Sequence, residues 1–146
     1  MKSPSPQSTH LGQLDPKAFL ADEELLKTLG ARATPVPCKT DCVLFRQDAP
    51  PVGVYIVHDG PVTLSMTTPD GQSLFAVQAL PGSLIGLPAV ISNQPYSISA
   101  MAFSGAQIGF VSHADFTALM HADPHLSLKM LEVLAAEVRS ARKALY

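Results

Sequence analysis

The central part of the chain, residues 32–111, alternates apolar and polar positions with a period of two, which is the pattern of half-buried β-strands. The alternation is clearest over residues 62–67. A Pro-Asp-Gly turn at 69–71 then predicts a hairpin, and residues 74–80 predict its returning strand. Other short apolar runs predict strands over 43–45, 54–57, 97–103 and 106–111. Seven or eight short strands joined by turns at this spacing indicate a sandwich, a barrel or a jelly roll.

Before this β-region the pattern is helical. Asp15 is a good N-cap and Pro16 suits the next position, and the apolar residues that follow lie on one face until Gly30 ends the pattern. These signals predict one amphipathic helix over residues 15–30. The Ser-, Pro- and Gln-rich residues 1–14 predict a disordered tail.

After the β-region, residues 112–146 also read as helical. Ser112 caps a short helix, and Asp123-Pro124 caps and starts a long helix that runs to Tyr146. Along this last helix apolar residues recur at three- and four-residue spacing, as in a coiled coil: Leu131, Leu134, Val138, Ala141 and Leu145. Only two heptads are covered, so the stripe is compatible with pairing to a second chain and with packing on the β-domain. The predicted organisation is a tail (1–14) followed by one domain (15–146) made of an N-terminal helix (15–30), a β-domain (32–111) and C-terminal helices (112–146).

A glycine-rich stretch over residues 82–102 interrupts the predicted strands. Gly82 and Gly86 permit close approach to the main chain, and Pro88 suits a first helical position. Residues 86–91 therefore predict one helical turn after a glycine bend, with backbone N–H groups free to bind an anion. The stretch contains no Lys, Arg, Asp or Glu, so it has the form of a phosphate-binding turn without the usual charges.

Composition and charge exclude several classes of protein. The 146 residues, 47% of them hydrophobic, are enough for one domain with a substantial core. The formal net charge of −2 gives no basic field for nucleic acid, and two cysteines are too few for a disulfide framework. The N-terminus lacks the apolar segment of a signal peptide, and no apolar run reaches transmembrane length. We therefore expect a cytoplasmic protein that binds no membrane and, by this chain alone, no nucleic acid.

The sequence shows no pattern typical of a catalytic or metal site. Cys38 and Cys42 form a C-x3-C pair, but no further Cys or His lies close in sequence to complete a metal site. The five histidines form neither H-x-H nor H-E-x-x-H, which argues against the metal site of a cupin. No serine lies in a G-x-S-x-G motif. We expect no metal, no cofactor and no catalytic residue, and two partly buried cysteines with a structural role.

The order of these elements resembles the cyclic-nucleotide-binding domain of the catabolite-activator (Crp/Fnr) superfamily. Residues 43–48 resemble the family's LF-x-x-G-D strand, and residues 53–64 resemble its YxIxxGxVxL segment. The Asp-Gly pair at 70–71 falls at the usual hairpin, and residues 81–86 match the start of the phosphate-binding cassette. The resemblance covers about residues 38–146. It implies a mainly β fold with flanking helices: a cyclic-nucleotide-binding-type β-roll (a double-stranded β-helix or jelly roll) with an N-terminal helix and a long C-terminal helix.

The resemblance also implies a ligand site, from which the sequence departs. In members that bind cyclic nucleotides, a Glu after the second cassette glycine bonds the ribose, and a later Arg pairs with the phosphate. Leu87 stands at the Glu position and Tyr96 at the Arg position, whereas Ser97 matches the family. Each loss should cost on the order of 1–3 kcal/mol of binding free energy. The residues corresponding to the family's site are Gly82, Gly86, Leu87, Pro88, Ala89, Tyr96 and Ser97.

Two readings of Tyr96 stay open, because it can be a core aromatic or a surface on which a ligand stacks. If Leu87 and Tyr96 alone weaken cyclic nucleotide binding, the double substitution Leu87→Glu with Tyr96→Arg should strengthen it, provided that the pocket is open.

These observations favour a non-catalytic sensor or regulatory module that responds to a small molecule other than cyclic AMP or cyclic GMP. The alternatives are a protein-interaction module with a vestigial pocket and, less well supported by the histidine pattern, a cupin-like metalloenzyme. The family pairs through its last helix, which implies a homodimer through the apolar stripe, with Glu132, Glu137 and Arg139 flanking the contact. The family's transcription factors continue into a helix-turn-helix that this sequence does not contain, so we expect no sequence-specific DNA binding.

Overall fold

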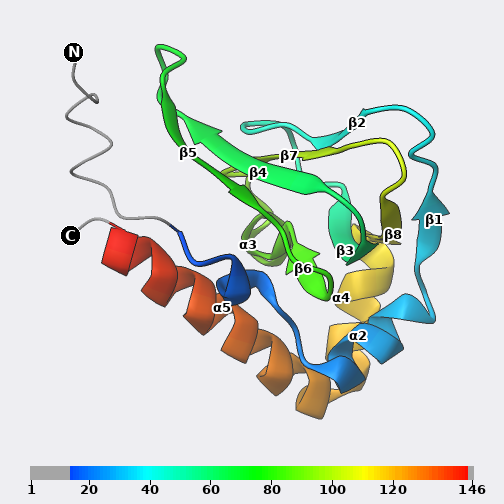
Figure 1. The fold of residues 1–146 in the computed structure, drawn as a ribbon. Helices are drawn as coiled ribbons and strands as arrows, with labels where there is room; N and C mark the ends of the chain where they lie inside the picture. Colours follow the sequence, from blue (N-terminus) through cyan, green and yellow to red (C-terminus); the bar gives the residue numbers. More distant parts are fainter. Residues whose placement is uncertain (1–13, 145–146) are drawn as a thin grey trace, which may run out of the picture.

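The computed structural model describes residues 14–144 and places eight antiparallel strands in two sheets, with helices before and after them (Figure 1). The strands are β1 (Thr34–Val36), β2 (Cys42–Phe45), β3 (Gly53–Asp59), β4 (Val62–Thr67), β5 (Ser73–Gln78), β6 (Ser83–Ile85), β7 (Ser99–Ala102) and β8 (Gln107–Ser112). The helices are η1 (Pro16–Phe19, a 3-10 helix), α2 (Glu23–Gly30), α3 (Leu87–Ser92), α4 (His113–Ala122) and α5 (Pro124–Ala144). This architecture confirms the fold class predicted from the sequence.

The chain crosses from one sheet to the other several times, and these crossings close the fold into a roll. One sheet has the order β1-β8-β3-β6 and the other has the order β2-β7-β4-β5. The crossing from β3 to β4 is made at Gly60, whose φ of 91° is in the left-handed region that favours glycine. A Cβ atom on Gly60 would lie 2.5 Å from Ala106 Cα, so the close approach of the two segments also requires glycine. The predicted β4–β5 hairpin is present, with Met66 opposite Phe75.

Two hydrophobic cores share strand β3. Tyr55 and Val57 point into the core between the sheets, and Val54 and Ile56 point into a second core beneath the helices. Both faces of β3 are therefore buried, which explains why this strand is a continuous apolar run rather than an alternating one.

The single helix predicted over residues 15–30 is wrong, because this segment forms two short helices. Asp15 caps η1 by accepting a hydrogen bond from Lys17 N (3.0 Å), and Asp22 caps α2 by accepting one from Glu24 N (2.8 Å). Between them Leu20 is extended and forms a β-bridge with Ser83. The sequence contains two N-cap signals, and pairing of the intervening residue with β6 breaks the helix.

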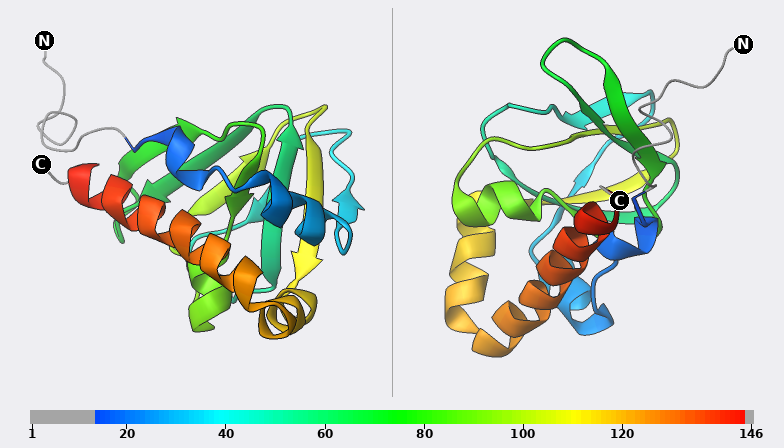
Figure 2. Two further views of the ribbon diagram at one scale, coloured as in Figure 1. Left: turned by 90° about the horizontal axis from the view of Figure 1, so that it is seen from below. Right: turned by 90° about the vertical axis from the view of Figure 1, so that its left-hand side faces the viewer.

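The C-terminal helices begin where the sequence predicted. Ser112 Oγ accepts a hydrogen bond from Asp115 N (3.1 Å), and Asp123 Oδ1 accepts one from His125 N (3.1 Å). Helix α5 runs along one side of the roll and lies against η1 (Figure 2). The predicted tail, apart from residue 14, and the predicted seam residue Leu145 lie outside the described residues. Within residues 14–144, no helix combines the length and the apolar composition needed to cross a membrane.

Candidate ligand-binding site

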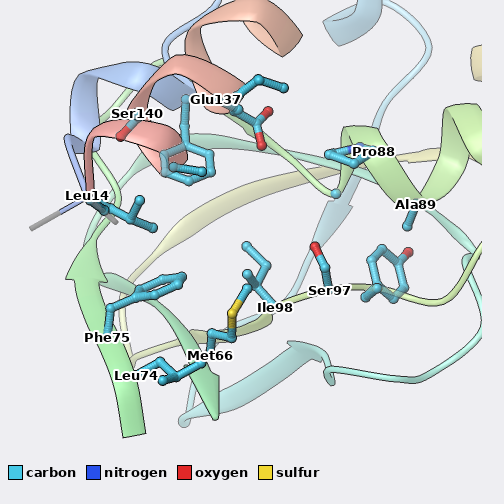
Figure 3. A pocket seen from close by; sticks show the side chains of 16 residues that line it. Leu14, Met66, Leu74, Phe75, Pro88, Ala89, Ser97, Ile98, Glu137 and Ser140 are labelled. Atoms are coloured by element: carbon cyan, nitrogen blue, oxygen red, sulfur yellow. The ribbon is translucent and has the colours of Figure 1, made fainter. Parts of the chain in front are cut away.

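A cavity of about 420 Å³ lies between the β4–β5 hairpin, helix α3 and helix α5 (Figure 3). Side chains from these elements, from η1 and from the segment before β7 form its walls, and most of them are apolar. Met66 and Phe75 come from the hairpin, Pro88 from α3 and Ile98 from the segment before β7. Its size and apolar lining are typical of a site for a small organic molecule.

Helix α3 forms one end of this cavity, as a single helical turn of the kind predicted from the sequence. Gly86 precedes the helix with a φ of 91°. A Cβ atom on Gly86 would lie 3.2 Å from the Tyr96 ring and 3.3 Å from Gly53 O, so this glycine allows the chain to pass close to β3. Asn93, also with positive φ, ends the helix.

The structure brings five of the seven residues predicted for the site to the cavity wall: Gly86, Pro88, Ala89, Tyr96 and Ser97. Gly82 and Leu87 are not part of the wall. Gly82 lies beside Leu20 and Leu26. Leu87 is 0% exposed and packs in the second core, among residues such as Leu25 and Val54. The expectation that Leu87 occupies the position of a ribose contact therefore does not match its location.

Tyr96 belongs to the core between the sheets, and only part of its ring reaches the cavity. It is 2% exposed and stacks on Phe45, with 4.1 Å between the ring centroids. Its hydroxyl donates to Gly53 O (2.7 Å) and accepts from Val52 N (3.0 Å) and Gly53 N (3.1 Å). A phenol has one donor and two acceptor positions, so no hydrogen-bonding capacity is left for a ligand. The geometry supports the core reading of this residue.

Glu137 on α5 is a candidate site residue that was not among those predicted for the site from the sequence. Figure 3 shows its carboxylate pointing into the cavity. Its Oε2 atom is buried and has no hydrogen-bond partner among the described residues. Burial raises the pKa of this carboxyl to about 8. Glu137 was expected to flank a dimer contact, and the structure turns its side chain toward the roll.

A signal for this residue was present in the sequence. The inner face of α5 repeats at three- and four-residue spacing, and Glu137 interrupts an otherwise apolar or small stripe: Met130, Val133, Glu137, Ser140 and Ala144. A carboxylate in the middle of a buried stripe is more informative than one on a solvated face.

The electrostatics of the cavity differ from those of a phosphate site. Among the described residues that line it, none is a Lys, Arg or His, and Glu137 is the one charged residue. An anion placed here would meet no positive charge and would lie near a carboxylate. The turn has the backbone form of a phosphate site, but the surrounding side chains do not complete one.

The two stripes on α5 overlap, because Leu134 packs against the second core and Val138 and Ala141 also line the cavity. Met130 and Val133 are buried in the second core, whereas Leu131 is 57% exposed and Val138 is 49% exposed. The outer stripe borders a shallow groove along α5 that also includes Leu134 and two arginines. Packing on the β-domain and an apolar outer face therefore coexist on one helix.

The two cysteines and the histidines form no site within residues 14–144. Cys38 is buried and Cys42 is partly buried, and both are free thiols. Burial raises the pKa of the Cys38 thiol, and the neighbouring Cys42 raises it further by a smaller amount. In the same part of the chain, no three His, Cys, Asp or Glu side chains gather as they would around a metal ion.

Comparison with known proteins places the chain in a family. The family model for the cyclic nucleotide-binding domain matches residues 35–123, which is more than half of the chain. The catabolite activator protein of Thermus thermophilus has a TM-score of 0.69 and 22% identity, over 88% of this chain and 60% of that one. The N-terminal domain of a transcriptional regulator from Streptomyces coelicolor A3(2) has a TM-score of 0.63 and 23% identity, over 90% of this chain and 94% of that one. The sensor domain of the transcriptional regulator DNR from Pseudomonas aeruginosa has a TM-score of 0.62 and 21% identity, over 80% of this chain and 79% of that one.

At these identities the solved structures show a shared fold. The chain spans 60% of the length of the Thermus thermophilus protein, and 53% and 59% of the length of two further similar structures, so the activity of those whole proteins is not carried over. No curated protein gives a significant sequence match. The family match, the roll with its glycine-led turn and the long final helix agree, and the chain belongs to the cyclic nucleotide-binding domain family, with the fold of the sensor domains of Crp/Fnr-type regulators.

Proposed function

We propose that this domain is a non-catalytic sensor module whose effector is a small molecule other than cyclic AMP or cyclic GMP. The observation that carries the proposal is that the described wall of the cavity holds no cationic side chain. The cavity lies where the family's cassette forms a wall, yet its described lining has one carboxyl group, that of Glu137, and no Lys, Arg or His. The apolar volume favours a small organic ligand, and the missing counter-charge disfavours a cyclic phosphate.

Cyclic nucleotides are expected to bind with Kd values weaker than about 1 mM. The phosphate would lose its charge-assisted partner, because Tyr96 stands at the arginine position and its hydroxyl is engaged by Gly53. Isothermal titration calorimetry with cyclic AMP and cyclic GMP is the measurement. Glu137→Gln serves as control, since it removes the repelling carboxylate without supplying a cation, and binding should stay weak. Micromolar affinity of the wild-type domain for either nucleotide would contradict the proposal.

Helix α5 is the element through which ligand binding would be transmitted. Glu137, Val138 and Ala141 form part of the cavity wall, and Val138 also borders the outer groove. The helix is tied to the N-terminal segment by a hydrogen bond from Asp15 N to Ser140 Oγ (2.9 Å). A ligand that contacts this wall can shift α5 and thereby change its outer face.

We further propose that the outer face of α5 pairs with a second copy of the chain. The exposed apolar side chains repeat at a and d positions, which suits a two-stranded contact. Leu128 and Leu131 are 60% and 57% exposed, a large apolar exposure for neighbouring positions on one helix. Pairing would cover both.

Leu128→Asp combined with Leu131→Asp should convert a dimer to a monomer without unfolding the domain, because burying these charges in a helix pair is costly. These positions are better targets than Leu134, which packs against the second core, or Val138, which lines the cavity. Light scattering gives the mass and circular dichroism gives the helix content. Thr117→Asp with Ala118→Asp, at exposed positions of α4, adds the same charge as a control and should leave the dimer intact. A wild-type domain that is monomeric at high micromolar concentration would end the dimer proposal and favour a different partner for this face.

A further inference from the structure

We infer that the effector is a mostly apolar, aromatic molecule that carries one cationic amine, and that Glu137 is the residue that selects it. The inference rests on the proposed function, because it takes the cavity as the ligand site. It is carried by a buried carboxylate oxygen without a partner at the wall of an apolar cavity.

The first step is that residues 14–144 offer the Glu137 carboxyl no partner. Its side chain points into the cavity (Figure 3), and no hydrogen bond or ion pair joins it to another residue within 14–144. The Ser140 hydroxyl accepts from Asp15 N and makes no hydrogen bond to Glu137, and the Tyr96 hydroxyl donates to Gly53 O. Buried polar groups are normally hydrogen-bonded, so the missing partner points to the ligand.

The second step concerns the groups that face Glu137 from each packed element. The walls contributed by η1, the β4–β5 hairpin, α3 and the segment from residue 97 to β7 hold no group that ionises and one hydroxyl, that of Ser97: Phe19, Met66, Leu74, Phe75, Pro88, Ala89, Ser97 and Ile98. Tyr96 is the one other titratable group on the wall, and its hydroxyl turns toward β3. Burial alone therefore accounts for the raised pKa of Glu137, about 8.

The third step compares ligand classes. An anion would be repelled by the ionised carboxylate, and a purely apolar molecule would leave Oε2 unpaired. A carbonyl ligand could accept only from the unionised carboxyl and would leave the second oxygen without a donor. An ammonium group supplies the missing charge and up to three donors, so both carboxylate oxygens can be satisfied. The aromatic side chains Phe19, Phe75 and Tyr96 suit a flat ring and add attraction for a cation.

A proton balance follows from this assignment. Below about pH 8 most of the free protein carries an unionised Glu137, whereas the ion pair needs the carboxylate. Binding of an ammonium ion therefore releases one proton to solvent. The affinity should rise by up to about tenfold per pH unit between pH 6 and 8 and then level off. A carbonyl ligand needs the unionised form, so its affinity would stay nearly constant below about pH 8 and fall above that pH.

The test uses three probes that share the indole ring: tryptamine as the cation, 3-ethylindole as its neutral isostere and indole-3-acetate as the anion. Binding to the whole chain is measured by calorimetry or intrinsic fluorescence at pH 6, 7 and 8. At pH 8 tryptamine should bind at least about tenfold more tightly than 3-ethylindole, and indole-3-acetate should bind most weakly. Glu137→Gln should abolish the preference for the amine and leave the affinity for 3-ethylindole unchanged.

The outcomes separate the inference from the function on which it rests. Four results would overturn the amine assignment alone. The three probes could bind equally, or the anion could bind more tightly than the amine. The preference for the amine could survive Glu137→Gln, or the affinity for tryptamine could fall as pH rises. Failure of all three probes, including the neutral one, would also count against the cavity as a ligand site.

A stability measurement shows whether the variant is folded and whether Glu137 is desolvated. The folded pKa lies above the ordinary value of 4.5, so the folded state binds more protons than the unfolded state between these values. The wild type should lose stability as pH rises from about 4.5 to about 8, and Glu137→Gln should not. The variant should therefore melt at a higher temperature than the wild type at pH 8 and at a similar one at pH 4.5. Parallel curves for the two proteins would mean that Glu137 is solvated and would overturn the inference.

Discussion

Leu87→Glu is expected to destabilise the domain by at least about 3 kcal/mol and to create no cyclic-nucleotide site. The resemblance to the family suggested that a Glu at this position, with Tyr96→Arg, would restore binding. The structure gives Leu87 a different environment, since the side chain is 0% exposed among Leu25, Leu29 and Val54. The substitution would bury a carboxylate in an apolar core, where the described residues provide no partner.

The measurement is chemical denaturation followed by circular dichroism, together with calorimetry using cyclic AMP. Ile91→Glu is the matched control, because Ile91 lies on the same helix and is 46% exposed. It should change the free energy of unfolding by no more than about 0.5 kcal/mol. A Leu87→Glu variant that is as stable as this control would show that the side chain at position 87 can reach solvent or the cavity.

Tyr96→Ala should cost about 3–5 kcal/mol of unfolding free energy, and Tyr96→Phe about 1–3 kcal/mol. The alanine variant loses a buried ring that stacks on Phe45 and leaves a cavity in the core between the sheets. The phenylalanine variant keeps the ring but removes the hydroxyl that bonds three backbone atoms of Val52 and Gly53. Loss of this hydroxyl would leave the start of β3 without its anchor to the segment before β7.

Tyr55→Phe is the control for Tyr96→Phe. It shows whether the loss of unfolding free energy is specific to the Tyr96 hydroxyl or is the same for any buried phenol hydroxyl. The Tyr55 hydroxyl makes one hydrogen bond, to Leu44 O (3.0 Å), and its loss should cost less than the loss of the three bonds of Tyr96. Burial raises the pKa of Tyr55 to about 12, so this phenol is neutral in the conditions of the experiment. Equal costs for the two Tyr→Phe variants would contradict the role assigned to Tyr96.

Local signals predicted most of the elements. The hairpin turn at 69–71, the cap at Ser112 and the helical turn after Gly86 all appear where the sequence placed them. Each depends on residues within a few positions of one another, so the order of residue types determines it. The N-terminal segment shows the limit of such signals, since pairing of Leu20 with Ser83, far along the chain, divides the predicted helix.

The sequence by itself determined that the chain forms a β-roll followed by a long helix and that the glycine-rich stretch over residues 82–102 carries no charge. That Leu87 and Tyr96 stand at the positions of the family's charged contacts is what the resemblance implies. Only the tertiary structure decided that Leu87 faces a second core, that Tyr96 is anchored to Gly53 and that Glu137 points into the cavity. The reason is physical. The surroundings of a side chain depend on which distant segments pack against it, and the walls around Glu137 come from segments that begin near residue 14 and end near residue 144. A carboxylate at the same place on an isolated helix would be solvated, and packing of the roll against α5 is what removes it from water.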